Sequence, residues 1–131
     1  MTFDETQKSF LEKPLLARMC TIDSDGYPHA VPVWFMRDGD QIVIISVRAT
    51  RKVGHIQANP KGAMVIGGDT NDGGGYSMQG DFVIAPDPDL YWMKALTNRY
   101  ETGADAERDI EAWSKLDMII LRFTAKTIRK V

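Results

Sequence analysis

The sequence has very little cysteine and histidine, the residues from which disulfides and many metal centres are built. It contains one cysteine, Cys20, and two histidines, His29 and His55, in 131 residues. A single cysteine cannot form a disulfide within the chain, so nothing in the composition requires an oxidising compartment. The two histidines lie far apart in the sequence and do not by themselves indicate a metal site.

Long apolar segments and a surplus of positive charge are also missing. No segment approaches the roughly 20 apolar residues of a membrane span, and residues 1–13 lack the apolar centre of a signal peptide. We therefore expect a cytoplasmic protein with no membrane attachment. The formal net charge of −2 argues against a protein whose main role is to neutralise nucleic-acid phosphates or an anionic membrane.

The remaining composition is that of an ordinary globular domain. Hydrophobic residues make up 44% of the chain and charged residues 26%, which is the balance of a folded protein. A chain of 131 residues is long enough to bury one continuous core. Because no linker, repeat or low-complexity tract interrupts it, we expect a single domain over residues 1–131.

The hydrophobic pattern predicts mainly strands. Strands are predicted over residues 16–22, 29–36, 41–47, 63–67, 76–85 and 118–124, with an extension over 127–131. Helices are predicted over residues 2–13, 51–57, 88–103 and 106–116. This order indicates a mainly β fold, a closed or split β-barrel of six or so largely antiparallel strands with helices packed outside. Pro32 removes a ladder donor, so the second strand should lie at an edge or be broken.

The most informative segment runs from Ser46 to Lys52, where a predicted strand ends and a short helix begins after Thr50. The first turn of a helix has unpaired amide N–H groups that favour an anion, and the two hydroxyls can donate hydrogen bonds as well. Arg51 and Lys52 oppose the helix dipole, each by about 0.3–1 kcal/mol, unless an anion is bound. The segment therefore predicts a phosphate site. The alternative is that both cations are simply solvated.

Several short motifs surround this segment. They are DGYPH at 25–29, VPVWF at 31–35, a strand ending at Ser46, TRK at 50–52, NPK at 59–61 and MQG at 78–80. Together they resemble the flavin-binding half of the pyridoxamine 5′-phosphate oxidase-like split-barrel proteins, a family that includes deazaflavin-dependent enzymes. The resemblance covers residues 15–85 well and the final strand loosely.

The resemblance implies a flavin-dependent oxidoreductase that binds FMN in a groove between the subunits of a homodimer and transfers hydride to or from a small organic substrate. It implies that the 46–52 segment holds the cofactor phosphate and that the backbone of residues 31–34 lies along the isoalloxazine or deazaflavin ring of the cofactor. The cofactor-binding residues implied are Val31, Pro32, Val33, Trp34, Ile45, Ser46, Thr50, Arg51, Lys52 and Tyr76. No catalytic side chain or metal ligand is assigned.

Three features depart from the family pattern. The chain stops at Val131, without the C-terminal segment with which pyridoxamine 5′-phosphate oxidases grip their product, so we do not expect that substrate. Ser46 stands where threonine is common, which keeps the hydroxyl. The loop over residues 69–75 has no counterpart.

Other interpretations stay open at this point. One is a reductase that uses the deazaflavin coenzyme F-420, and another is a protein that binds a flavin or haem without catalysis. The acidic balance argues against a barrel that binds single-stranded nucleic acid. We expect His29 to be packed or hydrogen-bonded, and not a haem ligand or an acid–base group. We expect Trp92 and Trp113 in the core, and leave Trp34 and Tyr76 open between core and pocket wall.

Overall fold

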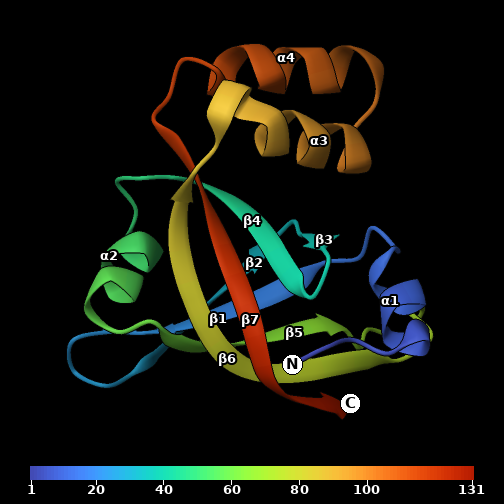
Figure 1. The fold of residues 1–131 in the computed structure, drawn as a ribbon. Coiled ribbons are helices and arrows are strands. Elements are labelled where there is room, and N and C mark those ends of the chain that lie inside the picture. The colour runs from blue at the N-terminus through green and yellow to red at the C-terminus, as the bar shows by residue number, and fades with distance from the viewer.

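Seven strands form one antiparallel sheet in the computed structural model, which describes residues 1–131 (Figure 1). They are β1 (Ala17–Ile22), β2 (Pro28–Val33), β3 (Met36–Asp38), β4 (Gln41–Val47), β5 (Lys61–Gly67), β6 (Gly75–Pro86) and β7 (Met118–Lys130). Their order across the sheet is β2-β1-β5-β6-β7-β4-β3. The edge strands β2 and β3 do not pair with each other, so the curled sheet is not closed. This confirms the predicted mainly β split-barrel fold.

The long strands β6 and β7 run through the centre of this sheet and carry much of its core. Phe82 on β6 and Phe123 on β7 are both buried, with ring centroids 4.8 Å apart. Gly62 on β5 makes room for the Phe82 ring, because a Cβ at this position would lie 2.5 Å from that ring. The pairing register shifts between Gln79 and Gly80. Such a bulge bends the strand pair and lets it curve around the core.

The predicted single strand over residues 29–36 is wrong, because the structure divides it into β2 and β3. The break falls at Trp34 and Phe35. The Phe35 amide donates to the hydroxyl of Tyr100, and its carbonyl accepts from Arg99. Side chains from a distant helix therefore replace the strand partner of this residue. The prediction that Pro32 marks an edge strand is confirmed, since β2 pairs only with β1.

Four α-helices and one short 3-10 helix surround the sheet. They are α1 (Glu5–Leu11), α2 (Arg51–Ala58), the 3-10 helix η1 (Pro88–Leu90), α3 (Tyr91–Tyr100) and α4 (Gly103–Trp113). The first helix begins later than predicted because the Asp4 carboxylate caps it, accepting the Gln7 amide at 2.7 Å. It buries Phe10 and Leu11 against the sheet. The helix predicted over residues 51–57 agrees with α2.

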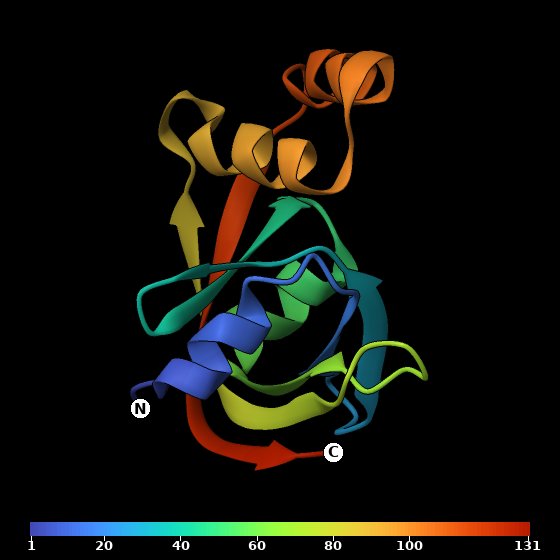
Figure 2. The ribbon, with the colours of Figure 1, turned by 90° about the vertical axis from the view of Figure 1, so that its right-hand side faces the viewer.

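The third and fourth helices form a pair at one end of the sheet (Figures 1 and 2). Helix α3 begins at Tyr91 and not at Pro88, because Asp89 and Leu90 adopt positive φ angles of 57° and 55°. Asp87 nevertheless caps α3 from across this turn. Its two carboxylate oxygens each accept a backbone amide of the first turn, from Trp92 and Met93, at 2.9 Å.

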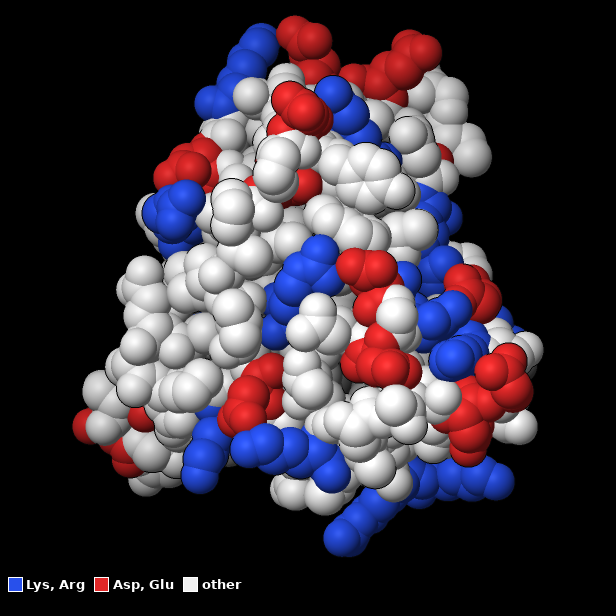
Figure 3. Space-filling view, in the orientation of Figure 1, with Lys and Arg blue, Asp and Glu red and all other residues white.

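Charged side chains of both signs are spread over the surface. Figure 3 shows acidic and basic groups interspersed on one face, with basic groups extending from the end where β7 finishes. The ion pairs include Arg122 with Asp38 at 2.8 Å and Lys126 with Asp81 at 2.8 Å. None of the helices combines the length and the apolar character needed to cross a membrane.

Candidate functional site

A groove of about 470 Å³ lies where the ends of β2 and β4 meet the start of β7. The residues that line it are Leu16, Pro32, Val33, Trp34, Ile45, Ser46, Val47, Trp113, Leu116 and Met118. Half of the predicted cofactor-binding residues are among them. Two strands that are separated in sequence thus bring the VPVWF motif and the end of the Ser46 strand to one apolar surface.

The hydroxyls of Ser46 and Thr50 meet at one end of this groove. Ser46 is buried, and its Oγ lies 3.2 Å from the Thr50 Oγ1. Both hydroxyls also reach the carbonyl oxygen of Val47, at 2.9 Å from Ser46 and 3.2 Å from Thr50. Thr50 occupies the N-cap position of α2 as predicted, but its side chain makes no cap hydrogen bond. Because the two hydroxyls bond to each other and to Val47, neither accepts a hydrogen bond from the first amides of α2.

The amide donors and cations at the start of α2 are without partners in the chain. The amides of Arg51, Lys52 and Val53 take part in no backbone hydrogen bond, and no side chain caps them. Neither Arg51 nor Lys52 forms an ion pair, although ten ion pairs occur elsewhere. Burial lowers the pKa of Lys52. Free amides and uncompensated cations at one helix terminus match the donor set that a phosphate group requires.

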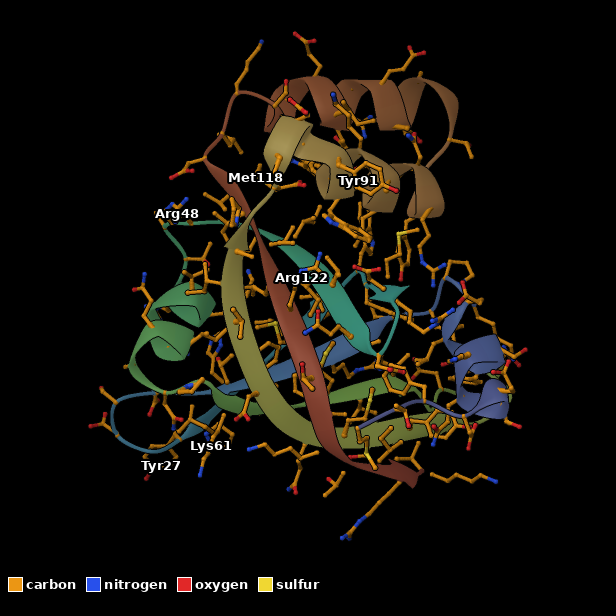
Figure 4. The ribbon with its side chains drawn as sticks, viewed as in Figure 1. Tyr27, Arg48, Lys61, Tyr91, Met118 and Arg122 are labelled. Atoms are coloured by element: carbon orange, nitrogen blue, oxygen red, sulfur yellow. The ribbon has the colours of Figure 1, made fainter.

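A further cation, Arg48, fixes the loop that leads into α2. Its side chain pairs with the Asp117 carboxylate at 2.9 Å, and its amide donates to the Asp117 carbonyl at 2.9 Å. Figure 4 shows Arg48 in this loop, near the start of β7 where Met118 is labelled. The sequence analysis missed Met118, whose partner across the ladder is Val47. Only the strand order could have revealed this neighbour.

Aromatic side chains form the wall of the groove beside Trp34. The Trp34 ring stacks on Tyr100 with centroids 5.0 Å apart and planes 3° from parallel, and it meets the edge of Trp113 at 5.8 Å. Trp34 is thus a pocket residue. The expectation that Trp113 belongs to the core is wrong, because it is half-buried and lines the groove. Trp92 packs against a small core cluster and lies under the Arg122 guanidinium.

Two of the predicted cofactor residues lie neither in the groove nor at the start of α2. Tyr76 is buried against Phe10, with ring centroids 5.2 Å apart, at the start of β6. Val31 packs against the main core. The structure therefore brings together the implied residues at the ends of β2 and β4 and at the start of α2. Val31 and Tyr76 lie apart from them.

The two histidines are brought together despite their separation in sequence. The rings of His29 and His55 lie 5.2 Å apart, edge to face, and the His55 Nδ1 is 2.9 Å from the hydroxyl of Thr21. The Nδ1 of His29 is buried without a hydrogen-bond partner. No group of three metal-ligating side chains includes them. This placement between the β1–β2 hairpin and α2 agrees with a packing role.

A comparison with protein families decides the classification of the chain. The family model described as pyridoxamine 5′-phosphate oxidase matches residues 3–131. The chain belongs to this family. No curated protein matches the sequence.

Solved structures support the fold assignment of this family member. A protein named F420 reductase shares 26% sequence identity with a TM-score of 0.76, over 97% of this chain and 98% of its own. A candidate pyridoxamine 5′-phosphate oxidase from Listeria innocua shares 17% identity with a TM-score of 0.74, over 97% of this chain and 96% of its own. General stress protein 26 from Bacillus anthracis str. Sterne shares 14% identity with a TM-score of 0.67, over 95% and 89%.

Proposed function

We propose that this protein is an oxidoreductase that binds FMN and holds the cofactor phosphate at the start of α2. The observation that supports this most directly is the unpartnered set of Arg51, Lys52 and the first amides of α2 beside the Ser46–Thr50 hydroxyl pair. Cations at a helix N-terminus oppose the helix dipole, and a phosphate reverses that penalty by accepting from both side chains and backbone.

The groove beside this site has the character that a flavin ring needs. Its walls are apolar apart from Ser46, and the amide of Trp34 takes part in no backbone hydrogen bond, so it is free to donate to a ring edge. When bound, the ring itself supplies the hydride chemistry. The residues at the start of α2 would hold the phosphate, and apolar residues of the groove such as Val33 and Ile45 would shield the ring from water.

We further propose that two copies of the chain associate over the open side of the groove. Leu16 and Leu116 line the groove and are 38% and 47% exposed. Large apolar side chains at the rim of a cofactor groove favour coverage by a second surface. Light scattering should give twice the 14.7 kDa mass of one chain, and a monomer at micromolar concentration would contradict the dimer.

The deazaflavin coenzyme F-420 is the second candidate cofactor. The specific observation in its favour is the protein named F420 reductase, which shares 26% identity over nearly the whole chain. FMN and F-420 both carry a phosphate, so both can use the α2 site. The affinity of the purified protein for each cofactor, measured by the quenching of cofactor fluorescence, separates the two candidates.

The double variant Arg51→Ala, Lys52→Ala tests the site itself. Each cation contributes a charge-assisted hydrogen bond of about 1.5–3 kcal/mol, so removing both should weaken cofactor binding by at least about 100-fold. The matched control is Arg129→Ala, Lys130→Ala, which removes two adjacent exposed cations from the far end of β7. An unchanged affinity in the Arg51, Lys52 variant would refute the phosphate site.

Cofactor that binds tightly but is reduced by no donor would indicate a binding protein without turnover.

A further inference from the structure

Tyr100, the last residue of α3, adjoins the groove without lining it. Its ring stacks on the ring of Trp34, with centroids 5.0 Å apart and planes 3° from parallel. Trp34 is the groove residue whose free amide the proposed function directs to the cofactor ring. Tyr100 belongs to none of the short motifs around the phosphate site. Its contact with Trp34 is therefore a feature of the site that the cofactor contacts alone do not explain.

The Tyr100 hydroxyl joins two segments of the chain that each lead into the groove. It donates to the Leu15 carbonyl at 2.8 Å and accepts from the Phe35 amide at 3.2 Å. Leu16 and Trp34, which adjoin these two residues in the sequence, both line the groove. Burial raises the pKa of Tyr100, so the hydroxyl keeps the proton that it donates. One hydroxyl therefore sets the relative position of two groove residues.

The backbone of Trp34 is held on both of its sides. On one side, Val33 pairs with Ala17 at the last position of the ladder between β2 and β1. On the other side, Tyr100 binds the Phe35 amide. A peptide group is planar, so a bond to its N–H fixes the whole unit. Because β2 ends at Val33, the bond from Tyr100 is the next fixed point of the backbone and limits how far the free Trp34 amide can turn.

Tyr100 is itself held in place through its neighbour Arg99. The Arg99 guanidinium donates to the Phe35 carbonyl at 3.0 Å. It also donates to three carbonyls where α1 ends, at 2.8 to 3.1 Å, those of Leu11, Glu12 and Lys13. The last carbonyls of a helix have no partner within it, so a cation is favourable there. The end of α3 is thereby fixed to the end of α1.

We propose that Tyr100 is a positioning residue for the cofactor ring, because its hydroxyl and its stacked ring hold Trp34 so that the free Trp34 amide meets the ring edge. Tyr100 acts through Trp34 and does not itself line the groove. A phenylalanine would supply the same stacking surface, so the hydroxyl is the part of the side chain that this role requires. The inference rests on the proposed function for the presence of a flavin-type ring, but the bond to Phe35 can be measured without a ligand.

The first measurement is hydrogen exchange of the Phe35 amide in the protein without ligand, relative to the amide of the buried Ile44 in β4. This relative rate should be about tenfold higher in Tyr100→Phe, because the amide loses its acceptor. The matched control is Thr97→Val, which removes another buried hydroxyl of α3, one that donates to the Met93 carbonyl of the same helix. It should leave the relative rate unchanged. A wild-type rate in Tyr100→Phe would overturn the hold on Phe35.

The second measurement is the affinity for riboflavin and for FMN, which share the ring and differ in the phosphate. Tyr100→Phe should weaken the binding of both by the same factor, about tenfold, whereas Thr97→Val should weaken neither. The double alanine variant at the start of α2 should weaken the binding of FMN alone. If only F-420 binds, its phosphate-free deazaflavin takes the place of riboflavin.

The third measurement reports on the Trp34 amide directly. Saturating riboflavin should shift the amide proton resonance of Trp34 in the wild type and in Thr97→Val. In Tyr100→Phe the shift at saturation should be less than half as large, because the amide is no longer held toward the ring edge. A general loss of stability would lower the affinity without changing the shift of the saturated protein.

Each of three results would overturn the positioning role. The first is a loss of FMN affinity in the double alanine variant, with riboflavin affinity and the Trp34 shift of Tyr100→Phe as in the wild type, in which case the proposed function stands. The second is a loss of riboflavin affinity in Thr97→Val as large as that in Tyr100→Phe. The third is a wild-type protein that binds none of these ligands, in which case the proposed function fails as well.

Discussion

The hydroxyl of Thr50 illustrates how a single side chain can leave a binding site open. At the N-cap of α2 it could accept an amide of the first helical turn, which is the common arrangement. It is directed instead to Ser46 and the Val47 carbonyl. The N–H groups of the first turn consequently remain free to donate, and Arg51 and Lys52 lie beside them with no carboxylate partner. Local rules broken together at one place are where a ligand is expected.

Lys52 should make cofactor binding sensitive to alkaline pH. Burial lowers its pKa, and only the protonated form attracts a phosphate. The affinity for FMN should therefore be highest below the lowered pKa and should fall as the pH rises through it. This fall should occur at a lower pH than the titration of an exposed lysine, whose pKa is about 10.4. Lys52→Arg should abolish this fall because arginine keeps its charge.

The measurement is the FMN dissociation constant across the alkaline range for the wild type, Lys52→Arg and the control Lys130→Arg. The control changes an exposed lysine on β7 and should follow the wild type. Identical profiles for wild type and Lys52→Arg would remove Lys52 from the phosphate site.

At the scale of elements, Asp87 determines how firmly α3 is anchored. Its carboxylate is buried and accepts two amides of the first turn, both at 2.9 Å. Asp87→Ala should lower the free energy of unfolding by about 2 kcal/mol, near the upper range for loss of an N-cap. Asp87→Asn keeps one acceptor and should lose about half as much. Urea denaturation measures both, and an unchanged midpoint for Asp87→Ala would show that the helix does not need this cap.

The stability of the turn between α3 and α4 should depend on pH through Glu101. The neighbouring carboxyl of Asp109 raises the pKa of Glu101, while the hydrogen-bonded guanidinium of Arg108 holds the pKa of Asp109 below its usual range. Because the folded-state pKa of Glu101 is raised, its stabilising contribution is present below the ordinary value and is lost as the pH rises through the raised one. Glu101→Gln remains neutral and keeps a donor for Asp109.

The melting temperature of Glu101→Gln should therefore increase relative to the wild type as the pH rises from the ordinary glutamate pKa through the raised pKa of Glu101. Glu107→Gln, which changes an exposed glutamate of α4, is the matched control and should show no such trend. A constant difference in melting temperature between Glu101→Gln and the wild type across this range would contradict the raised pKa of Glu101.

Local signals explain which elements could be predicted. The strand over 41–47 and the helix after Thr50 are set by adjacent residues, and the structure has them at nearly the predicted positions. The break at Phe35 depends on Arg99 and Tyr100, which lie on a helix far along the chain. The groove wall at Trp113 depends on the pairing of β4 with β7. Contacts of this kind cannot be read from spacing within a short window, and they account for both errors.

At the scale of the whole molecule, cofactor binding should stabilise the folded chain. A ligand at 100 times its dissociation constant adds about 2.7 kcal/mol to the free energy of unfolding. For a domain of this size that corresponds to an increase in melting temperature of roughly 10 °C. FMN should produce this increase in the wild type, and at the same FMN concentration the Arg51, Lys52 double alanine variant should gain no more than about 2 °C. An equal increase in both proteins would place the cofactor elsewhere.

The split in the sheet also bears on how the chain avoids uncontrolled self-association. Strand β2 is an edge, and two of its six residues are prolines, Pro28 and Pro32. Amides alternate in direction along a strand, and prolines cannot donate to β1, so residues 28, 30 and 32 face outward and only Ala30 offers an N–H there. A bare strand edge that accepts hydrogen bonds but can hardly donate them is a poor template for adding further strands. The same opening that admits a ligand is thereby protected from amyloid-like growth.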